Sequence, residues 1–275
     1  MVRSVDAVSS RAAASEFCNL LSAKLGTIFF PHNAISYGEL ADAVASGSLG
    51  FAWMPPVPAI DLIDQGLATV LALPVRRGAV SYQAAMIVAR GGPKTLPELK
   101  GTRVAWVDRG STSGYIVPRE HLYALGLDPR VHFSDEVFLH GHDNVVDAVV
   151  SGRAAMGATF VSLEPGSQNV AQAGWTDAAG RNPKAVEIVA TAGPIPNDAF
   201  VVSKRVPEDV AAGVLACLMD NESPEAKRVF MQLLRAETFQ RATAAHFDPL
   251  RRVLRASRAR GDSSAHRWCA RATTH

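Results

Sequence analysis

The sequence predicts an α/β protein built around largely parallel sheets, and three observations support this prediction. Short runs of β-type residues alternate along the chain with stretches of helical periodicity, an order typical of βαβ units. The chain has 275 residues, which is enough for one large domain or two of ordinary size. Hydrophobic residues make up 48% of the sequence, as expected of a folded chain with a core.

The first half of the chain is expected to alternate helices and strands. In the first long helix, Phe17, Leu21 and Leu25 recur at helical spacing, and Gly47 ends the second helix. The expected elements are a strand at 2–8, helices at 9–25, 37–45 and 59–65, and strands at 50–54, 69–73 and 84–89.

A second block of elements starts near Pro93. A short helix that Thr95 is expected to cap precedes a strand at 104–107, and a turn at 108–114 leads into a helix carrying His121. The segment 193–198 is expected to be a chain crossing between lobes. The remaining expected elements are a strand at 138–139, a helix at 143–150, a strand at 157–160, an irregular loop at 164–181, strands at 186–190 and 199–202, and helices at 208–219 and 224–234.

Charge and hydropathy exclude several classes of function. The 28 basic and 26 acidic side chains nearly cancel, so no strong overall field would collect nucleic acid or an anionic membrane. No window approaches the roughly 18 apolar residues of a membrane span. The arginine-rich end of the chain, from residue 251, is expected to be a partly ordered, solvated tail rather than a nucleic-acid arm.

Cysteine usage and the first thirty residues bear on cofactors and location. Cys18, Cys217 and Cys269 are far apart and show no metal-site spacing, so we expect neither a metal nor another cofactor. Charged residues interrupt the N-terminal region, which therefore lacks the apolar core of a signal peptide. The chain is expected to be cytoplasmic if complete as given, or otherwise to have been processed already.

The turn at 108–114 carries the clearest chemical signal. Backbone N–H groups are free in the first turn of a helix, where the helix dipole is positive, so an oxyanion can bind there. Ser111, Thr112 and Ser113 would add hydroxyl donors, and Gly114 would let the backbone come close to a ligand. Alternatively, Ser111 or Thr112 only caps the helix, and periodicity does not decide between the two interpretations.

The run GTRVAWVDRGSTSGYIVP at 101–118 resembles the central motif of the phosphonate-binding components of ABC importers, whose relatives also bind phosphite or similar oxyanions. Further matches follow in the same order and cover nearly all of the chain except its extreme C-terminus. They are FAWMPP at 51–56, PVRRGAVSYQA at 74–84, FLHGHDNVVDAVVSGRAAMGA at 138–158, GPIPNDAFVVS at 193–203 and HFDPLR at 246–251.

This resemblance implies a type II periplasmic-binding-protein fold, in which two α/β lobes joined by two crossing strands close around a ligand. Lobe 1 would comprise residues 1–84 and 194–250, lobe 2 would comprise 85–193 with the Ser-Thr-Ser-Gly turn, and 251–275 would be the basic tail.

The resemblance also implies a set of ligand contacts. Ser111, Thr112 and Ser113 match the turn that holds the phosphonate oxygens, and His142 matches a histidine that donates to another ligand oxygen. Without this resemblance, the position of His142 beside Asp143 favours a structural cap over a ligand contact.

Three further positions are weaker matches. Tyr82 corresponds to a ligand-facing tyrosine and Tyr37 to a less certain one, although either ring alternatively packs in the core. Asp198 corresponds to an acidic position that pairs with a ligand amine in aminoalkylphosphonate binders, although Asn-Asp in a loop is commonly a turn. Glu164 is a further candidate for a carboxylate near such an amine, although its position in a loop is equally compatible with plain solvation.

The sequence departs from its relatives at three positions. Gly50 and Ala155 stand where relatives commonly carry Asp, and Ala84 stands where many carry Ser. These changes affect the expected identity of the ligand more than the expected fold.

The resulting expectation is a solute-binding protein that captures a small phosphonate, phosphite or phosphate-like oxyanion for an ABC permease, in the periplasm or cell envelope if a signal was removed. A cytoplasmic ligand sensor of the same fold is the alternative. An enzyme is less favoured, because the only conceivable base pair, His142 and Asp143, would point about 100° apart on a helix.

Overall fold

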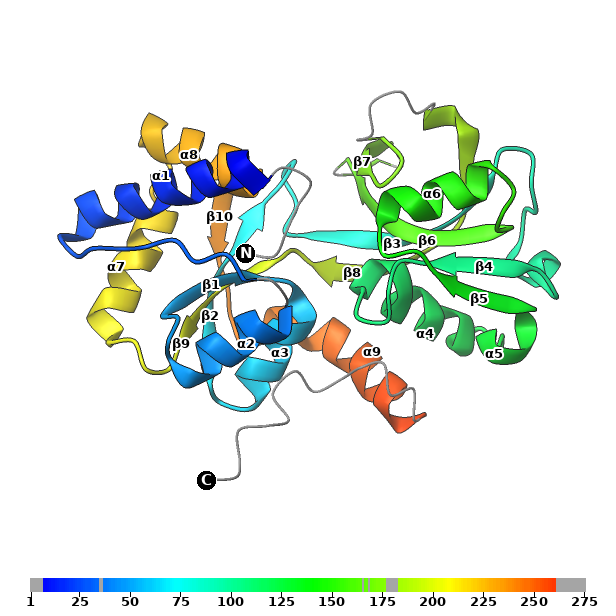
Figure 1. Cartoon of the computed structure of the whole chain (residues 1–275), viewed down its shortest axis with the longest axis horizontal. Coiled ribbons are helices and arrows are strands. Elements are labelled where there is room, and N and C mark those ends of the chain that lie inside the picture. Colours follow the sequence, from blue (N-terminus) through cyan, green and yellow to red (C-terminus); the bar gives the residue numbers. More distant parts are fainter. Residues whose placement is uncertain (1–6, 35–36, 165, 168, 177–182, 261–275) are drawn as a thin grey trace. The chain divides into compact units, whose positions relative to one another are not determined.

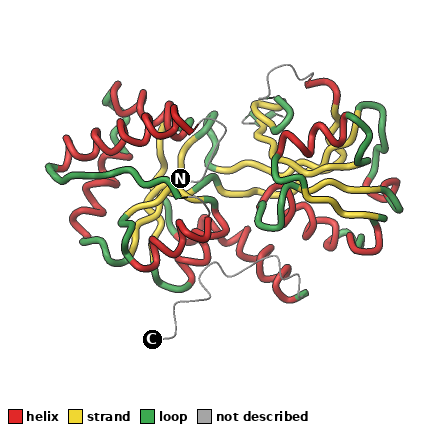
Figure 2. Tube along the Cα trace, in the orientation of Figure 1, coloured by secondary structure: helices red, strands yellow, loops and turns green. Residues whose placement is uncertain are grey.

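The computed structural model describes residues 7–34, 37–164, 166–167, 169–176 and 183–260. It confirms the α/β class, with one sheet in each of two compact units and helices around each sheet (Figures 1 and 2). Of the described residues, those in 7–80 and 196–248 belong to unit 1, and those in 81–195 and 249–260 belong to unit 2.

The sheet of unit 1 has four strands, in the order β1 (Phe51–Met54), β9 (Ala199–Ser203), β2 (Ala68–Val75) and β10 (Thr238–Arg241). Strand β9 is antiparallel to both β1 and β2, and β10 is antiparallel to β2. Helix α3 (Pro56–Asp64) connects β1 and β2, which run in the same direction but are separated by β9. The expected predominance of parallel pairing is therefore wrong for this sheet, because a strand from a distant part of the chain lies between the two parallel ones.

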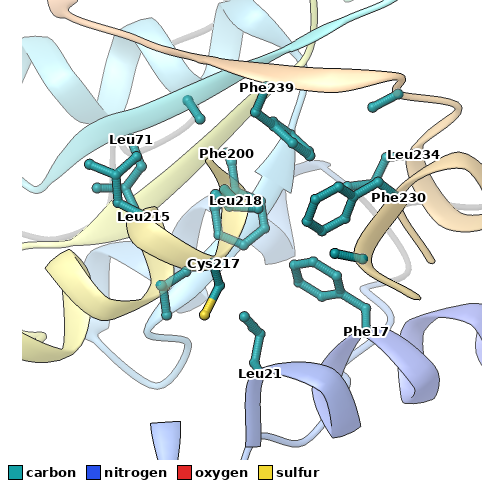
Figure 3. Packing of buried hydrophobic residues seen from close by; sticks show 14 of the residues in the cluster. Phe17, Leu21, Leu71, Phe200, Leu215, Cys217, Leu218, Phe230, Leu234 and Phe239 are labelled. Atoms are coloured by element: carbon teal, nitrogen blue, oxygen red, sulfur yellow. The ribbon is translucent and has the colours of Figure 1, made fainter. Parts of the chain in front are cut away.

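Among the described residues, five α-helices belong to unit 1, and four aromatic rings lie together in one of its core clusters. Phe17 from α1 meets Phe200 from β9 and Phe230 from α8, and the rings of Phe230 and Phe239 lie edge to face with centroids 5.0 Å apart (Figure 3). Besides α3, the helices are α1 (Ala7–Leu25), α2 (Tyr37–Ser46), α7 (Glu208–Leu218) and α8 (Pro224–Leu234).

The start of α1 corrects one expectation. Residues 7 and 8 lie in this helix and not in the predicted strand at 2–8, whose first residues are outside the described part of the chain. The small residues after Val8 favour continuing the helix towards Phe17.

The sheet of unit 2 runs in the order β5 (Asp135–Phe138), β4 (Arg103–Trp106), β6 (Met156–Leu163), β3 (Ser81–Ala89) and β8 (Val186–Pro196), and β7 (Val170–Ala173) also pairs with β6. Strand β4 is parallel to β5 and β6, whereas β3 and β7 are antiparallel to β6. The carboxyl ends of β4, β5 and β6 therefore meet at one edge, together with the amino end of β3.

The helices of unit 2 begin with a short 3₁₀ turn at Leu96–Leu99. Thr95 occupies its N-cap position but makes no cap, because its hydroxyl donates to Glu98 Oε1 at 2.7 Å. The others are a π-helix (Thr112–Ile116), α4 (Val117–Ala124), α5 (Pro129–His132), α6 (His142–Val150) and α9 (Asp248–Ala259), whose first residue lies in unit 1.

Two segments differ from the expected loops. Strand β7 lies inside the segment 164–181, because Val161 and Ser162 of β6 find partners in Ala173 and Gln172. The range expected as a basic tail, 251–275, begins inside α9, where Leu250 and Leu254 are buried; residues 261–275 lie outside the described residues. Among the described helices, none has the length and apolar character needed to cross a membrane.

Candidate anion-binding site

The candidate site lies at the carboxyl edge of the parallel strands of unit 2. The turn at 108–114 follows β4, and the loop that leads to His142 follows β5. Backbone bonds hold these two connections side by side, since Leu139 N donates to Trp106 O at 3.0 Å and His140 N donates to Val107 O at 2.7 Å. This edge is where α/β proteins commonly bind ligands.

Local hydrogen bonds shape the turn before its helix begins. Asp108 Oδ1 accepts from Gly110 N at 2.8 Å, and Asp108 O accepts from Ser111 N at 3.1 Å. Ser111 Oγ then accepts from Gly114 N at 3.1 Å, which makes Ser111 the N-cap of the π-helix. For Ser111, the capping interpretation is the one seen in the structure. The hydroxyl of Ser111 can still donate while it accepts from Gly114 N, so its predicted ligand contact stays a prediction.

Thr112 and Ser113 differ from Ser111 in their backbone amides, because of the three amides only that of Ser111 has a partner among the described residues, Asp108 O. Their side chains are almost buried, with residue exposures of 7% and 4%. Among the described residues, neither the hydroxyls nor the backbone N–H groups of these two residues have a hydrogen-bond partner. The first turn thus presents two amides and two hydroxyls to a ligand, at the positive end of a helix.

Gly114 is required by packing against β4. A Cβ atom at this position would lie 2.3 Å from Val107 Cγ2 and 2.7 Å from Ser111 Oγ. Its carbonyl accepts from Val107 N at 3.2 Å, and its amide is taken by Ser111. The structure therefore explains Gly114 by a close approach to the strand, and the predicted contact with a ligand stays a prediction.

His142 is the first residue of α6, and its ring does not cap that helix. Its Nδ1 lies 2.8 Å from Oγ1 of Thr159 on β6, and the ring meets Phe160 edge to face with centroids 5.2 Å apart. Burial lowers the pKa of His142, an effect that the charges of Asp108 and Asp143 partly oppose. The imidazole is therefore neutral at pH 7, and its Nε2 has no hydrogen-bond partner among the described residues.

Tyr82 lies at the amino end of β3, at the same edge of the sheet. Strand β3 is antiparallel to β6, with Ala85 opposite Thr159, and it contacts the π-helix. Two of the altered positions pack as small residues in this sheet: Ala84 is fully buried on β3, and Ala155 N donates to Arg103 O at 3.0 Å.

The other two predicted contacts belong to unit 1. Tyr37 begins α2 and is 40% exposed, so its ring does not pack in the core. Asp198 lies between β8 and β9, where its Oδ2 is 3.8 Å from Nη2 of Arg76. The preceding Asn197 is buried and donates to Pro74 O at 3.0 Å. This hydrogen bond fixes the turn at 197–198 to strand β2.

Neither the contact of Thr159 with His142 nor the effect of the Asp108 charge on the pKa of His142 was predicted from the sequence. A single threonine in a strand carries no motif, whereas an Asp at the end of a strand before a glycine turn is a recognisable signal. Glu164, by contrast, is exposed and bonds Asn169 Nδ2 at 3.1 Å, away from these groups. In the described ranges, no group of three or more His, Cys, Asp or Glu side chains is arranged to hold a metal ion.

A family model described as the phosphonate ABC transporter periplasmic substrate-binding protein matches residues 1–247. This match covers most of the chain, including both connections that form the candidate site.

Several solved structures share the fold at low sequence identity. XAC2383 from Xanthomonas citri bound to ATP has a TM-score of 0.76 at 17% identity, over 92% of this chain and 95% of that one. A binding protein component of an ABC phosphonate transporter from Pseudomonas aeruginosa has a TM-score of 0.72 at 17% identity, over 96% and 87%. PhnD1 from Prochlorococcus marinus in complex with methylphosphonate has a TM-score of 0.69 at 18% identity, over 93% and 95%.

Proposed function

Because the chain belongs to the family of periplasmic substrate-binding proteins of phosphonate ABC transporters, we propose that its Thr112–Ser113 turn and His142 bind a small oxyanion. The family assigns the general role, which is capture of a solute for an ABC transporter. Our proposal concerns the residues and the chemistry of the ligand.

The observation that carries the proposal is the set of donors at Thr112 and Ser113. Two hydroxyls and two amides lack partners among the described residues, and so does Nε2 of His142, whose loop is hydrogen-bonded to Trp106 and Val107 just before the turn. Neither hydroxyl is among the buried side-chain atoms left without a partner, so solvent reaches both, and an anion that accepts from several of these donors replaces water with charge-assisted hydrogen bonds. A tetrahedral group with three oxygens, such as a phosphonate, phosphite or phosphate, has enough acceptors for this arrangement.

The position of Arg76 next to Asp198 favours a ligand that carries no amine. Arg76 already lies beside this carboxylate, so an ammonium group would have to compete with a guanidinium for it. We therefore expect methylphosphonate or phosphite to bind more tightly than 2-aminoethylphosphonate. Ligand contacts by Tyr37, Tyr82 and Asp198 stay predictions.

The proposal places units 1 and 2 as the two lobes of a type II periplasmic binding protein, which delivers its ligand unchanged to a permease. The family is periplasmic, and we propose the same location for this chain. Phosphorus NMR of the protein incubated with each ligand is expected to show no turnover.

Thermal unfolding in the presence of phosphate, phosphite, methylphosphonate and 2-aminoethylphosphonate tests the proposal. A ligand at a hundred times its Kd is expected to raise the free energy of unfolding by about 2.7 kcal/mol. The double variant Thr112→Val with Ser113→Ala should lose this response. If none of the four anions shifts the melting temperature of the unaltered protein, the proposed site is wrong.

A further inference from the structure

The hydrogen bond between His142 and Thr159 is partly buried within unit 2. Thr159 is fully buried on β6, and its hydroxyl has no described partner other than His142 Nδ1 at 2.8 Å. Gly174 closes the remaining space, because a Cβ atom there would lie 2.0 Å from Thr159 Oγ1 and 3.5 Å from His142 Cβ. All three residues belong to unit 2.

Two arrangements of the protons are compatible with the 2.8 Å distance between His142 Nδ1 and Thr159 Oγ1, and they differ in free energy. If Nδ1 carries the proton and donates to Thr159 Oγ1, the hydroxyl proton of Thr159 needs another acceptor. No described residue supplies one, and a buried donor without a partner destabilises the folded state. If the hydroxyl donates to Nδ1, Thr159 Oγ1 and His142 Nδ1 satisfy each other, and the ring proton lies on Nε2, where a ligand can accept it.

We propose that Thr159 is a positioning residue that fixes His142 in the Nε2–H tautomer and makes it a hydrogen-bond donor toward the ligand. The charged groups near the ring are Asp108, from the turn after β4, and Asp143, from α6 itself. Neither forms a hydrogen bond with the ring, so the threonine decides which nitrogen is protonated.

This tautomer has a consequence for ligand selection, which rests on the proposed function. Thr112, Ser113 and His142 would all donate, so a ligand must present acceptor oxygens at each of these positions. A fully deprotonated phosphonate or phosphite meets this requirement. A ligand whose only group in reach of Nε2 is a P–OH proton or an N–H does not meet it.

Nitrogen NMR of the imidazole rings in ligand-free, 15N-histidine-labelled protein tests the tautomer directly. The signals of His142 are assigned by their absence from the His142→Asn variant. We expect an unprotonated Nδ1 and a protonated Nε2 in the unaltered protein and in Thr159→Ser, which keeps the hydroxyl. Thr159→Val removes the hydroxyl, keeps the shape of the side chain and should lose this preference. Gly174→Ala should lose it as well, because the added Cβ atom would lie 2.0 Å from Thr159 Oγ1.

Affinity for methylphosphonate gives the second readout. Thr159→Val is expected to weaken binding about tenfold, the effect of losing one oriented hydrogen bond, and Thr159→Ser should restore most of it. A protonated Nδ1 in the unaltered protein overturns the proposal, whether or not Thr159→Val folds, and so does an Nε2–H tautomer that persists in that variant. Because the spectra are recorded without ligand, failure of all anions to bind would overturn the proposed function while leaving the tautomer result readable.

Discussion

Adjacent hydroxyl residues in the turn of unit 2 have different roles because they occupy different positions relative to the helix. Ser111 is the N-cap, where a side-chain oxygen reaches the amide of Gly114. Thr112 and Ser113 lie inside the first turn, where their own amides and hydroxyls lack partners among the described residues. We therefore expect stability and ligand binding to depend on different neighbouring residues, whose contributions mutation can separate.

The first prediction separates these two roles. Ser111→Ala is expected to lower the free energy of unfolding by about 1 kcal/mol, because Gly114 N loses its acceptor. Ser223→Ala is the matched control, since Ser223 caps α8 in unit 1 by accepting from Ala226 N at 3.2 Å. Urea unfolding should show similar losses for both.

Binding of the anion distinguishes the variants further. Titration calorimetry should show the affinity of Ser223→Ala unchanged and that of Thr112→Val lowered about tenfold or more, although Thr112→Val leaves the N-cap intact. A Thr112→Val variant with undiminished affinity would contradict the assignment of donors in this turn.

The second prediction concerns pH. Burial lowers the pKa of His142, so between this lowered value and about 6.5 the unfolded chain carries a proton that the native chain lacks. The free energy of unfolding contributed by His142 should therefore rise with pH across that interval, by at most about 1.4 kcal/mol per pH unit, and be constant above it.

Urea unfolding between about pH 5 and 8 checks this slope. His142→Asn should reduce the slope without abolishing it, because burial also lowers the pKa of His121. His121→Asn serves as the comparison, and each variant should remove only its own part. An unchanged slope in His142→Asn would show that this ring does not titrate as a buried group.

The local part of the site could be predicted from sequence, and the part made by distant residues could not. The run at 111–114 combines a strand end, hydroxyls and a glycine, each with a known local tendency. Thr159 is 17 residues from His142 and carries no motif, and only the parallel register of the sheet brings the two together. The tautomer of a histidine depends on such a contact.

At the scale of elements, the π-helix Thr112–Ile116 shows how packing decides local geometry. Gly114 approaches Val107 on the preceding strand, and the ring of Tyr115 lies edge to face with Trp106 and Phe138, with centroids 5.6 Å and 5.2 Å apart. Sequence periodicity indicated a helix here. The wider turn depends on these contacts, which no local pattern encodes.

The sheets show the same limit. The alternation of strands and helices correctly placed most elements, and β4 is indeed parallel to β5 and β6. Strand β9 nevertheless pairs with both β1 and β2, which are far from it in sequence. Periodicity identifies a strand but carries no information on which neighbour it will join.

The third prediction concerns the buried ion pair that supports α4. Arg119, whose side chain is 6% exposed, pairs with Glu136 at the end of the sheet, and Glu136 also accepts from Trp106 Nε1 at 2.8 Å. Glu136→Gln keeps the shape and an acceptor but removes the carboxylate charge that faces the buried guanidinium. We expect a loss of about 2 kcal/mol, below the roughly 3–5 kcal/mol of a fully buried pair because Glu136 is partly exposed.

The exposed pair of Arg103 and Asp135 on the same two strands provides the control. Asp135→Asn should change the free energy of unfolding by less than about 1 kcal/mol. Equal losses in the two variants, measured by urea unfolding, would mean that burial does not strengthen the Arg119 pair.

At the scale of the whole molecule, each unit has its own core, and the chain returns to unit 2 after completing the sheet of unit 1. Helix α9 makes this return, with Leu250 and Leu254 buried along one side. Just after the helix, Arg260 pairs with Glu120 on α4 and lies 4.7 Å from the centroid of the Tyr123 ring. These contacts link the last described residues to α4, the helix that follows the turn at 108–114.

The fourth prediction concerns the ion pair between Arg260 and Glu120, which are 140 residues apart in sequence. Glu120 has a side-chain exposure of 6%, so Arg260→Gln leaves its charge poorly compensated and should cost about 1–3 kcal/mol. Arg252→Gln, at an exposed position on α9, should have little effect. Adding Glu120→Gln to Arg260→Gln should recover much of the loss, because it removes the charge that Arg260 neutralised. Urea unfolding of the unaltered protein, the single variants Arg260→Gln and Glu120→Gln and the double variant completes this cycle, and additive effects would show that α9 and α4 are not coupled through this pair.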